Sequence, residues 1–440
     1  MPAPAQNILQ QVQTYQLSSL GYLQNLCCFI SNANTKFKDF EKLVGNLGDA
    51  VSFDLPPRLI TNNSLVVSAQ PAIQRTQSLI CSNPKSTFLS FSSAQFVYQV
   101  EEYMHRWGKS AVYEIGTQVE SDVAQVCLQN TFRFFGDGTT PITSYTQLAQ
   151  ALAMFRNFGS ATGRAKGFIS DIAEPQIIGT GLNQFALDRN NKDANSWELG
   201  SFSNCDWFKS NLLPIHYAGT EGTKGSTLTV VATNATGSLT WYNSNGTSST
   251  IPKTSDGSVT AIQFNGCNSA SDNNSIAQYD RLQFKDGVSG YTDLRYLTFI
   301  GHKVSNSPVQ FSAAQGSASN GSNVVVLVGP QSNAFSLQAN SCSYQNLNTP
   351  IVAGMQCSVM PSHKSGLIYA GDPLFLAMPK LPDQPPYYTG NEIDPDTGVS
   401  IRMYFGTMFG ADMMGIVHDC IYGYTLVPEM SMALVLPLTQ

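Results

Sequence analysis

The stretch that organises the chain reads SSAQFVYQVEEYMHRWGKSAVYEIGTQVESDVAQVC, residues 92–127. Apolar residues recur in it at steps of three and four over about eight helical turns, a spacing that puts them on one face of an α-helix. They are Phe96, Val100, Met104, Trp107, Ala111, Ile115, Val119, Val123 and Val126. At about 1.5 Å per residue, a helix over 94–127 would be a rod of roughly 50 Å. We therefore expect one long helix within residues 93–130, with the rest of the chain arranged around it.

The composition suits a protein with extensive surface contacts. Of 440 residues, only 12% are charged, which is about half the usual share. Ser, Thr, Asn and Gln replace the charges, and these residues form contacts without large desolvation penalties or strong salt dependence. The net charge of −6 and the lack of a basic run argue against a dedicated nucleic-acid binder, because each phosphate contact normally needs a Lys or Arg.

The cysteines and the hydropathy pattern indicate a cytosolic protein. The nine cysteines are scattered, odd in number and never spaced as CxxC, so we expect free thiols in a reducing compartment. The N-terminus has no positive charge ahead of an apolar core, and no run of about 18 apolar residues occurs. We therefore expect neither a signal peptide nor a membrane partner.

The segments before the long helix have no compact core of their own. Residues 1–47 have spaced apolar residues and indicate helical pieces on an N-terminal arm. In residues 48–92, alternating Val51, Phe53 and Leu55 and the later run TFLSF (87–91) predict two strands, with too few large apolar residues between them for a core. This segment is predicted to be an extended β loop that stands away from the body.

After the long helix, the pattern divides into three parts. Residues 131–216 mix helix and strand, with a short helix predicted to start at Ser144. Residues 217–345 consist of short β-rich runs at hairpin spacing with Gly, Asn, Ser and Asp in the turns, which predicts an inserted all-β barrel or sandwich. Residues 346–440 return to the mixed pattern and end in a strand over 432–438. The fold class is therefore α+β with an inserted β domain.

Charge is distributed unevenly among these segments. Residues 51–100 have Arg58, Arg75 and Lys85 against one acid, a net charge of +2, whereas residues 101–130 have a net charge of −3 and residues 351–440 of −5. Complementary patches of this kind can steer one copy of a chain onto another. We therefore expect the basic side chains of the loop to seat on an adjacent subunit. The candidate contact residues are Arg58, Arg75, Lys85, Glu101, Glu102 and Glu114.

No motif indicates catalysis, a cofactor or a metal. GTEGTKGS (219–226) fails the phosphate-loop spacing and is predicted to be a turn. The Asp-rich stretches at 272–274 and 394–398 lack the pattern of a calcium loop and are also expected to be structural. His418, Asp419 and Cys420 are adjacent and so do not face one another on a strand, while the other histidines are isolated in the sequence. We therefore expect no catalytic, cofactor-binding or metal-binding residues, and a protein that is not an enzyme.

The order of these parts resembles the major capsid proteins of tailed bacteriophages, which share the Hong Kong 97 fold. GDAVSFDLP (48–56) looks like the first strand of that family's extended loop, residues 87–93 look like its return, and residues 94–127 look like its spine helix. CDWFKSNLLP (205–214), DRLQF (280–284), NVVVL (323–327), LIYAGDP (367–373), and the closing stretch from IRMYF (401–405) through DCIYG (419–423) to VPE (427–429) resemble the short-tailed Salmonella-phage coat type. Two departures occur: Tyr279 stands where a Gly is usual, and Val427 where a basic residue often precedes the Pro.

This resemblance implies a shell subunit with an N-terminal arm, an extended loop, peripheral and axial domains, and an inserted barrel-like domain. It implies hexamers and pentamers of one chain around double-stranded DNA that is not bound sequence-specifically, with a portal protein, in a virion capsid assembled in the host bacterial cytoplasm. Only about 47 residues precede the loop, too few for a built-in scaffold, so a separate scaffolding protein is expected. The alternative is a β-rich spike or adhesin that binds a host surface, which would explain residues 217–343 but not the long helix.

Overall fold

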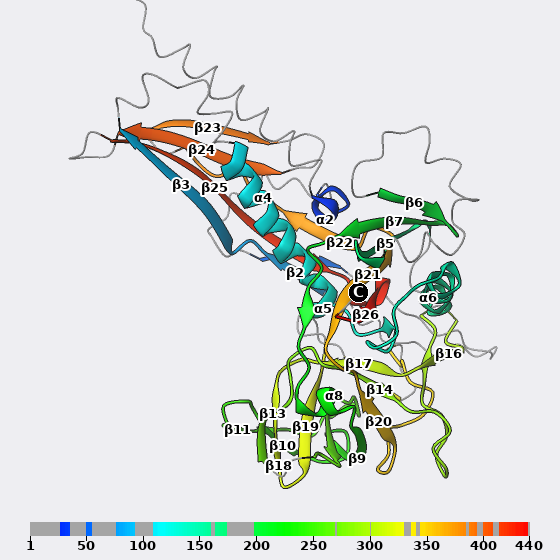
Figure 1. Ribbon diagram of the computed structural model, residues 1–440. Helices are drawn as coiled ribbons and strands as arrows, with labels where there is room; N and C mark the ends of the chain where they lie inside the picture. The colour runs from blue at the N-terminus through cyan, green and yellow to red at the C-terminus, as the bar shows by residue number, and fades with distance from the viewer. Residues whose placement is uncertain are drawn as a thin grey trace, which may run out of the picture.

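The computed structural model describes residues 27–35, 50–54, 76–92, 109–159, 163–173, 198–268, 271–299, 301–329, 336–339, 344–383, 387–393, 399–407 and 413–438. In these residues the chain is mostly β with few helices. It forms a central body, a long sheet that projects from the body, and a β-barrel at the opposite end (Figure 1).

The body is built on a seven-stranded mixed sheet. Its order is β4-β26-β21-β5-β7-β6, and β8 pairs with one end of β21. The β26–β4 and β5–β7 pairs are parallel and the others are antiparallel. The strands are β4 (Phe134–Phe135), β5 (Ala165–Ser170), β6 (Glu198–Phe202), β7 (Cys205–Ser210), β8 (Ile215–His216), β21 (His363–Ala370) and β26 (Ser431–Leu436). The predicted closing strand is thus present but ends at Leu436, and the η5 turn (Pro428–Met430) precedes it.

Helices α4 (Lys109–Ala124), α5 (Val126–Gln129) and α6 (Tyr145–Asn157) pack into the core of the body. The predicted helix start at Ser144 is confirmed, because its hydroxyl accepts the Gln147 backbone N–H and the Gln147 side chain returns to the Ser144 N–H. This capping box satisfies backbone donors that the first turn of a helix otherwise leaves unpaired.

The predicted long helix is present in the part that the structure describes. Its stripe of Ala111, Ile115, Val119, Val123 and Val126 is buried in the core, as the periodicity indicates. Residues 93–108, the first half of the prediction, lie outside the described residues. The helix is not continuous to residue 127, because the Gln125 N–H bonds to the Asp122 carbonyl three residues back and tightens the turn.

The projecting sheet, which we call the tongue, consists of β3 (Asn83–Ser92), β25 (Met413–Leu426), β24 (Ser400–Thr407) and β23 (Tyr388–Ile393) in that spatial order. Figure 1 shows it extending from the body with α4 alongside. The C-terminal part of β25 continues into the body and pairs with β22 (Leu374–Ala377). The first predicted strand of the loop corresponds to β1 (Ala50–Asp54), which pairs with β2 (Thr76–Ile80) in a separate hairpin. The second predicted strand, residues 87–91, lies in β3 of the tongue, and residues 55–75 lie outside the described part.

The barrel consists of six strands that close in the order β12-β9-β20-β14-β17-β19, because β12 also pairs with β19. They are β9 (Thr227–Thr233), β12 (Ala261–Asn265), β14 (Arg281–Phe284), β17 (Gln310–Ala313), β19 (Asn323–Gly329) and β20 (Gln356–Val359). Strands β18 (Ser317–Asn320) and β13 (Ser271–Ile276) extend the sheet from β19. Two ribbons complete it, β10 (Leu239–Tyr242) with β11 (Ser248–Ile251), and β15 (Arg295–Leu297) with β16 (Val304–Pro308).

The barrel extends beyond residue 345, where the sequence analysis placed its end. Strand β20 lies between β9 and β14 and pairs with both, so the barrel is closed only by residues after 345. The chain leaves the body at β8 and re-enters it at β21, and these two strands pair through Ile215 with Lys364 and His216 with His363. The barrel is therefore inserted between two neighbouring strands of the body sheet.

A short N-terminal segment, residues 27–34, docks on the body of its own chain. Its helix α2 (Cys28–Ser31) is buried against α4, and the Phe29 ring stacks on Phe168 of β5 with centroids 4.3 Å apart. The Asn34 N–H donates to the Leu374 carbonyl at 2.7 Å. This part of the predicted arm is therefore an element of the core.

Candidate functional site

The root of the tongue is tied to α4 through one carboxylate, that of Asp122. The Lys85 ammonium of β3 lies 3.0 Å from an Asp122 oxygen, and the Tyr422 hydroxyl of β25 donates to the same side chain. One acid on the helix therefore fixes two neighbouring strands of the tongue. The Lys85 and Asp122 side chains are 31% and 34% exposed, so solvent screens the ion pair and its net contribution is at most about 1 kcal/mol.

A second ion pair crosses the tongue between β24 and β25. The Arg402 guanidinium contacts both carboxylate oxygens of Asp419, with Nε 2.9 Å from Oδ1, and also donates to the Pro382 carbonyl. Asp419 belongs to the His418-Asp419-Cys420 stretch that the sequence analysis considered structural. Here it pairs across strands, while His418 and Cys420 are buried on the other face. Burial lowers the pKa of His418 to about 4, so this imidazole is neutral at physiological pH.

The face of the tongue opposite α4 carries a row of large side chains. Phe88, Val417, Tyr404 and Thr389 are directly paired in turn across the four strands, so their side chains project to one face. The Phe88 ring is 54% exposed, and the other three side chains are half-buried. The side chains of this row are therefore less buried than those of a strand whose face is covered by other parts of the protein.

Two of the six predicted contact residues are described by the structure. Lys85 pairs with Asp122 of its own chain, and Glu114 is exposed on α4, where it accepts a hydrogen bond from the Gln118 amide at 3.1 Å. Arg58, Arg75, Glu101 and Glu102 lie outside the described residues. Glu120, counted among the acids of the spine, is buried, so the acidic surface of α4 is smaller than its sequence indicates.

The junction between barrel and body holds a buried cluster that the sequence analysis missed. The Asp280 carboxylate, just before β14, accepts a hydrogen bond from His216 of β8 at 2.7 Å. It also accepts the backbone N–H groups of Ala277 at 2.7 Å and Gly219 at 3.1 Å. Burial raises the pKa of Asp280, and the hydrogen bond to His216 opposes that effect. Asp280 thus joins two loops of the barrel to a strand of the body.

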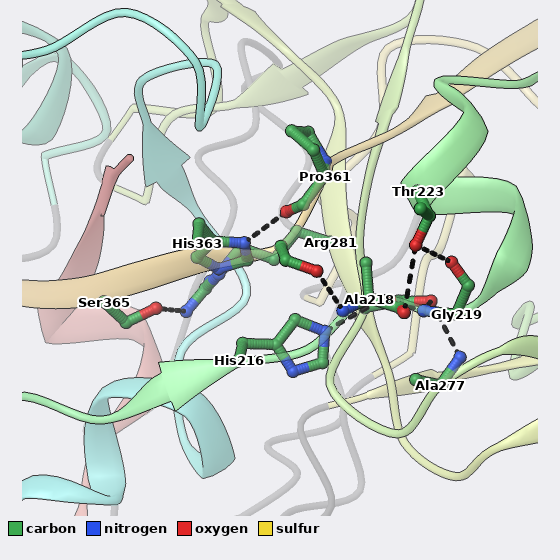
Figure 2. Close-up of polar contacts among 11 residues, drawn as sticks. His216, Ala218, Gly219, Thr223, Ala277, Arg281, Pro361, His363 and Ser365 are labelled. Atoms are coloured by element: carbon green, nitrogen blue, oxygen red, sulfur yellow. Dashed lines mark hydrogen bonds and ion pairs between the residues drawn. The ribbon is translucent and has the colours of Figure 1, made fainter. Parts of the chain in front are cut away.

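Arg281, the next residue, extends into the body. Its guanidinium donates to the Cys127 carbonyl at 2.7 Å, the Thr131 hydroxyl at 3.1 Å and, through Nε, to His363 Nε2 at 3.2 Å. Figure 2 shows Arg281 between His363 and Ser365, with His216 beside them. Arg281 is fully buried, and no carboxylate of the described residues lies within 4.0 Å of it. Burial lowers its pKa to about 10, which leaves the side chain charged at neutral pH.

The tautomer of His363 follows from its two contacts. Its Nδ1 lies 2.8 Å from the Pro361 carbonyl, which can only accept, so Nδ1 carries the proton and Nε2 accepts from Arg281. Burial and the adjacent Arg281 guanidinium hold the pKa of His363 well below its usual range. His363 and His216 lie with ring centroids 5.2 Å apart, so two histidines that are isolated in the sequence meet here.

Arg133 and aromatic rings form a second contact between barrel and body. The Arg133 guanidinium lies 4.0 Å from the centroid of the Phe158 ring and donates to the carbonyls of Glu429 and Ser431. Tyr296 of the barrel packs edge-on against Phe158, with centroids 5.8 Å apart. Cation–π and edge-to-face contacts of this kind are each worth about 0.5–2 kcal/mol. The arrangement is a structural joint between the barrel and the body.

The rejected ligand motifs adopt ordinary structure. Residues 219–226 hold a short helix, α8 (Thr220–Lys224), where the sequence analysis expected a turn; it ends at Gly225 with φ of 64°. Asp272 lies in β13 and accepts the Asn274 N–H, while residues 394–398 lie outside the described part. Among the residues that the structure describes, no group of three His, Cys, Asp or Glu is placed to hold a metal. Eight of the nine cysteines are described, all as free thiols.

Among the residues that the structure describes, no helix is both long enough and apolar enough to cross a bilayer.

No protein-family model and no curated protein matches the chain. Among solved structures it is similar to the capsid of Ralstonia phage GP4, at 8% identity and a TM-score of 0.42, over 94% of this chain and 93% of that one. It is similar to the capsid of the cyanophage P-SCSP1u at 11% identity and a TM-score of 0.37, over 88% and 83% of the two chains. A structure from Mycobacterium phage Che8 has 7% identity and a TM-score of 0.42, over 93% and 90%.

Proposed function

We propose that this chain is the major capsid protein of a tailed bacteriophage, the repeated subunit of an icosahedral shell around double-stranded DNA. The observation that carries the proposal is the tongue. Its strands extend from the body with α4 alongside (Figure 1). Phe88 and its row lie on the face opposite α4. A long sheet with one partly exposed face gains burial when neighbouring copies cover it.

The finer proposal is a Hong Kong 97-type fold with an inserted β domain of the short-tailed phage type. In this assignment, α4 and α5 form the second half of the spine helix, β1, β2 and β3 form the base and return of the extended loop, and the body sheet forms the axial domain. The resemblance of the sequence segments, in the same order along the chain, supports this assignment.

The position of the barrel favours a shell subunit over a spike or adhesin. Its two connections enter the body through paired strands, and Asp280 and Arg281 bind it into buried polar contacts there. A receptor-binding tip gains reach from a separate, mobile attachment, whereas this barrel is fixed to a body that carries the tongue. The protein is therefore proposed to be structural rather than enzymatic.

The proposed partners follow from the same assignment. Copies of the chain form hexamers and pentamers, a portal protein occupies one vertex, and a separate scaffolding protein controls assembly in the host cytoplasm. The net charge of −6 leaves the packaged DNA without strong or sequence-specific contacts to the shell.

The proposal is tested by mass spectrometry of purified virions and by electron microscopy of the expressed chain. We expect the chain to be the most abundant virion protein and to assemble, when expressed alone, into misshapen or wrong-sized particles that become uniform with a scaffolding partner. A chain that is a minor virion component, or that stays monomeric with the scaffold present, would refute the shell assignment. Uniform virion-sized shells formed without any partner would refute only the need for a scaffold.

A triple variant, Arg58→Ala, Arg75→Ala and Lys85→Ala, tests the role proposed for the loop. Each exposed pair contributes about 0–1 kcal/mol, but every subunit repeats it, so we expect a lower shell yield and lower heat resistance. The single Lys85→Ala variant is the control, because Lys85 already pairs within its own chain. Unchanged yield and heat resistance in the triple variant would show that these residues do not seat the loop.

A further inference from the structure

The N-terminal segment, residues 27–34, is held on α4 by a buried carboxylate. Glu120 projects from α4 toward the first turn of α2, where its two oxygens accept the backbone N–H groups of Phe29 at 2.6 Å and Ile30 at 3.0 Å. Glu120 is only 1% exposed to solvent. The carboxylate therefore satisfies donors that the first turn of α2 would otherwise leave unpaired.

No basic side chain offsets the charge of Glu120 within the described part of the chain, where no Lys, Arg or His nitrogen lies within 4.0 Å of it. The titratable groups that face it from the elements packed around it are neutral or acidic: Cys27 and Cys28 of the segment, Cys127 of α5, Tyr369 of β21, and Asp171 farther off beside Cys28. Burial raises the pKa values of these thiols and of the Tyr369 phenol, so they stay uncharged. Among the described residues, a negative charge on Glu120 is stabilised by backbone N–H groups of the segment and by no cation.

We propose that Glu120 is a proton-operated latch: residues 27–34 are held more firmly on the body when its carboxyl is protonated, and less firmly when it is ionised. The segment itself buries Glu120, because α2 packs directly against the face of α4 that carries this side chain. When the segment leaves, the Glu120 carboxyl is exposed to water and its pKa returns to the ordinary value of a glutamate. Docking therefore takes up a proton over the pH range in which the two states differ.

The sign of the effect follows from the two pKa values. Burial raises the pKa of Glu120 from 4.5 to about 7 in the docked state, against the lowering effect of the backbone N–H groups. Docking is therefore strongest below pH 4.5, weakens as the pH rises, and is constant above the docked-state value. The difference between the two values corresponds to a change of roughly two orders of magnitude in the docking equilibrium.

The latch acts on contacts that reach across the body. The Phe29 ring stacks on Phe168, the Tyr369 hydroxyl donates to the Asn32 carbonyl at 2.8 Å, and Asn34 forms a bridge with Phe375 beside the root of the tongue. Loss of the segment would uncover the core between α4 and β5 and free the edge of β22. A proton on Glu120 thus affects how firmly α4, β5 and the tongue root are held together.

Hydrogen exchange of the free full-length chain, read by mass spectrometry over residues 27–34, tests the latch between pH 5 and pH 8.5. After correction for intrinsic exchange rates, we expect the protection of Phe29 and Ile30 to fall by roughly 100-fold across this range in the unmodified chain. Glu120→Gln, which cannot ionise, should keep a flat profile. Glu114→Gln, an exposed acid on the same helix, is the matched control and should reproduce the original slope.

A flat profile in the unmodified chain, or an unchanged slope in Glu120→Gln, would overturn the proposal. If Glu120→Gln does not fold, infrared spectroscopy of the unmodified chain with ¹³C-labelled glutamate carboxyls decides the question. A protonated glutamate band present at pH 6 and lost by pH 8.5 supports the latch, and its absence at pH 6 refutes it. Neither measurement requires shell assembly, so the outcome is independent of the proposed function.

Discussion

Replacing Arg281 with Met should loosen the barrel from the body. The substitution keeps a long apolar stem but removes the donors to Cys127, Thr131 and His363, all of which are buried. Hydrogen bonds from a charged donor are each worth about 1.5–3 kcal/mol. Part of this lost stability is recovered, because the substitution also removes a buried charge that no carboxylate of the described residues offsets. We therefore expect the free energy of unfolding to fall by about 3–5 kcal/mol.

Two tryptophans allow the two parts to be followed separately. Trp207 is buried in β7 of the body, and Trp241 is buried in β10 of the barrel, where its indole N–H donates to Ser317 at 2.9 Å. Urea unfolding of single-tryptophan variants would report each part by fluorescence. In the original chain we expect the two transitions to coincide, and with Arg281→Met we expect the barrel and body to unfold at different urea concentrations.

A matched control is Arg295→Met, which removes an arginine of the barrel that pairs with Asp286 and Asp293 nearer the surface. Pairs of this kind contribute about 0–1 kcal/mol each, so we expect a small loss and transitions that still coincide. If Arg281→Met costs less than about 1 kcal/mol, or leaves the two transitions together, then the guanidinium does not join barrel and body as inferred here.

Three further predictions concern pH, packing and the limits of the barrel. Burial lowers the pKa of His418 to about 4, so its contribution to stability is complete above pH 6.5 and is lost as the pH falls through 4. By urea unfolding, the original chain should lose about 3 kcal/mol of stability over this pH range because of His418, and His418→Gln should not show that loss. Gly167→Ala should lower stability by about 1–3 kcal/mol by thermal unfolding, because its Cβ would lie 2.5 Å from the Trp207 ring. Residues 217–361 should fold alone with dispersed β-type amide shifts in NMR, whereas residues 217–345 should not, because they lack β20.

Each of these has a defined contrary result. An equal acid sensitivity in His418→Gln and the original chain would show that another group is responsible. Gly237→Ala is the control for packing, since nothing lies within 4 Å of its added Cβ, and equal effects at both glycines would show that the Trp207 contact is unimportant. A folded fragment 217–345 would show that the barrel closes without its sixth strand.

The long helix could be predicted because its signal is local. A stripe at steps of three and four needs only one face to be buried, and Ile115, Val119 and Val123 are buried where that pattern places them. The break at Gln125 follows from a backbone hydrogen bond to Asp122, which no side-chain pattern encodes. The acidic surface of the helix was overestimated, because the hydropathy pattern does not show that the Glu120 side chain is buried.

The end of the barrel and the polar junction depend on contacts between distant segments. Strand β20 is four residues long and lies after a stretch of loops, so its membership in the barrel is visible only from its pairing with β9 and β14. His216 and His363 are separated by the whole barrel in sequence, yet they are paired residues of β8 and β21. The adjacent Asp280 and Arg281 at the start of a strand were the one local signal, since a buried strand rarely carries two charges without partners.

The departure noted at Tyr279 has a clear structural meaning. Tyr279 has φ of 68°, in the left-handed region that favours glycine, immediately before Asp280. The backbone here adopts the conformation that suits glycine despite the larger side chain, and Tyr279 keeps a backbone hydrogen bond to Ala313 at 2.8 Å.

The pairing of β8 with β21 also bears on how the barrel can be exchanged during evolution. Since the chain departs and returns at adjacent positions, Ile215 beside Lys364, loss or exchange of everything between them would leave the strand order of the body sheet intact. The geometry of its two connections is therefore compatible with exchange of the barrel as one unit. Arg281 limits that freedom, because any successor must supply donors to the Cys127 carbonyl and the groups around it or leave them buried and unpaired.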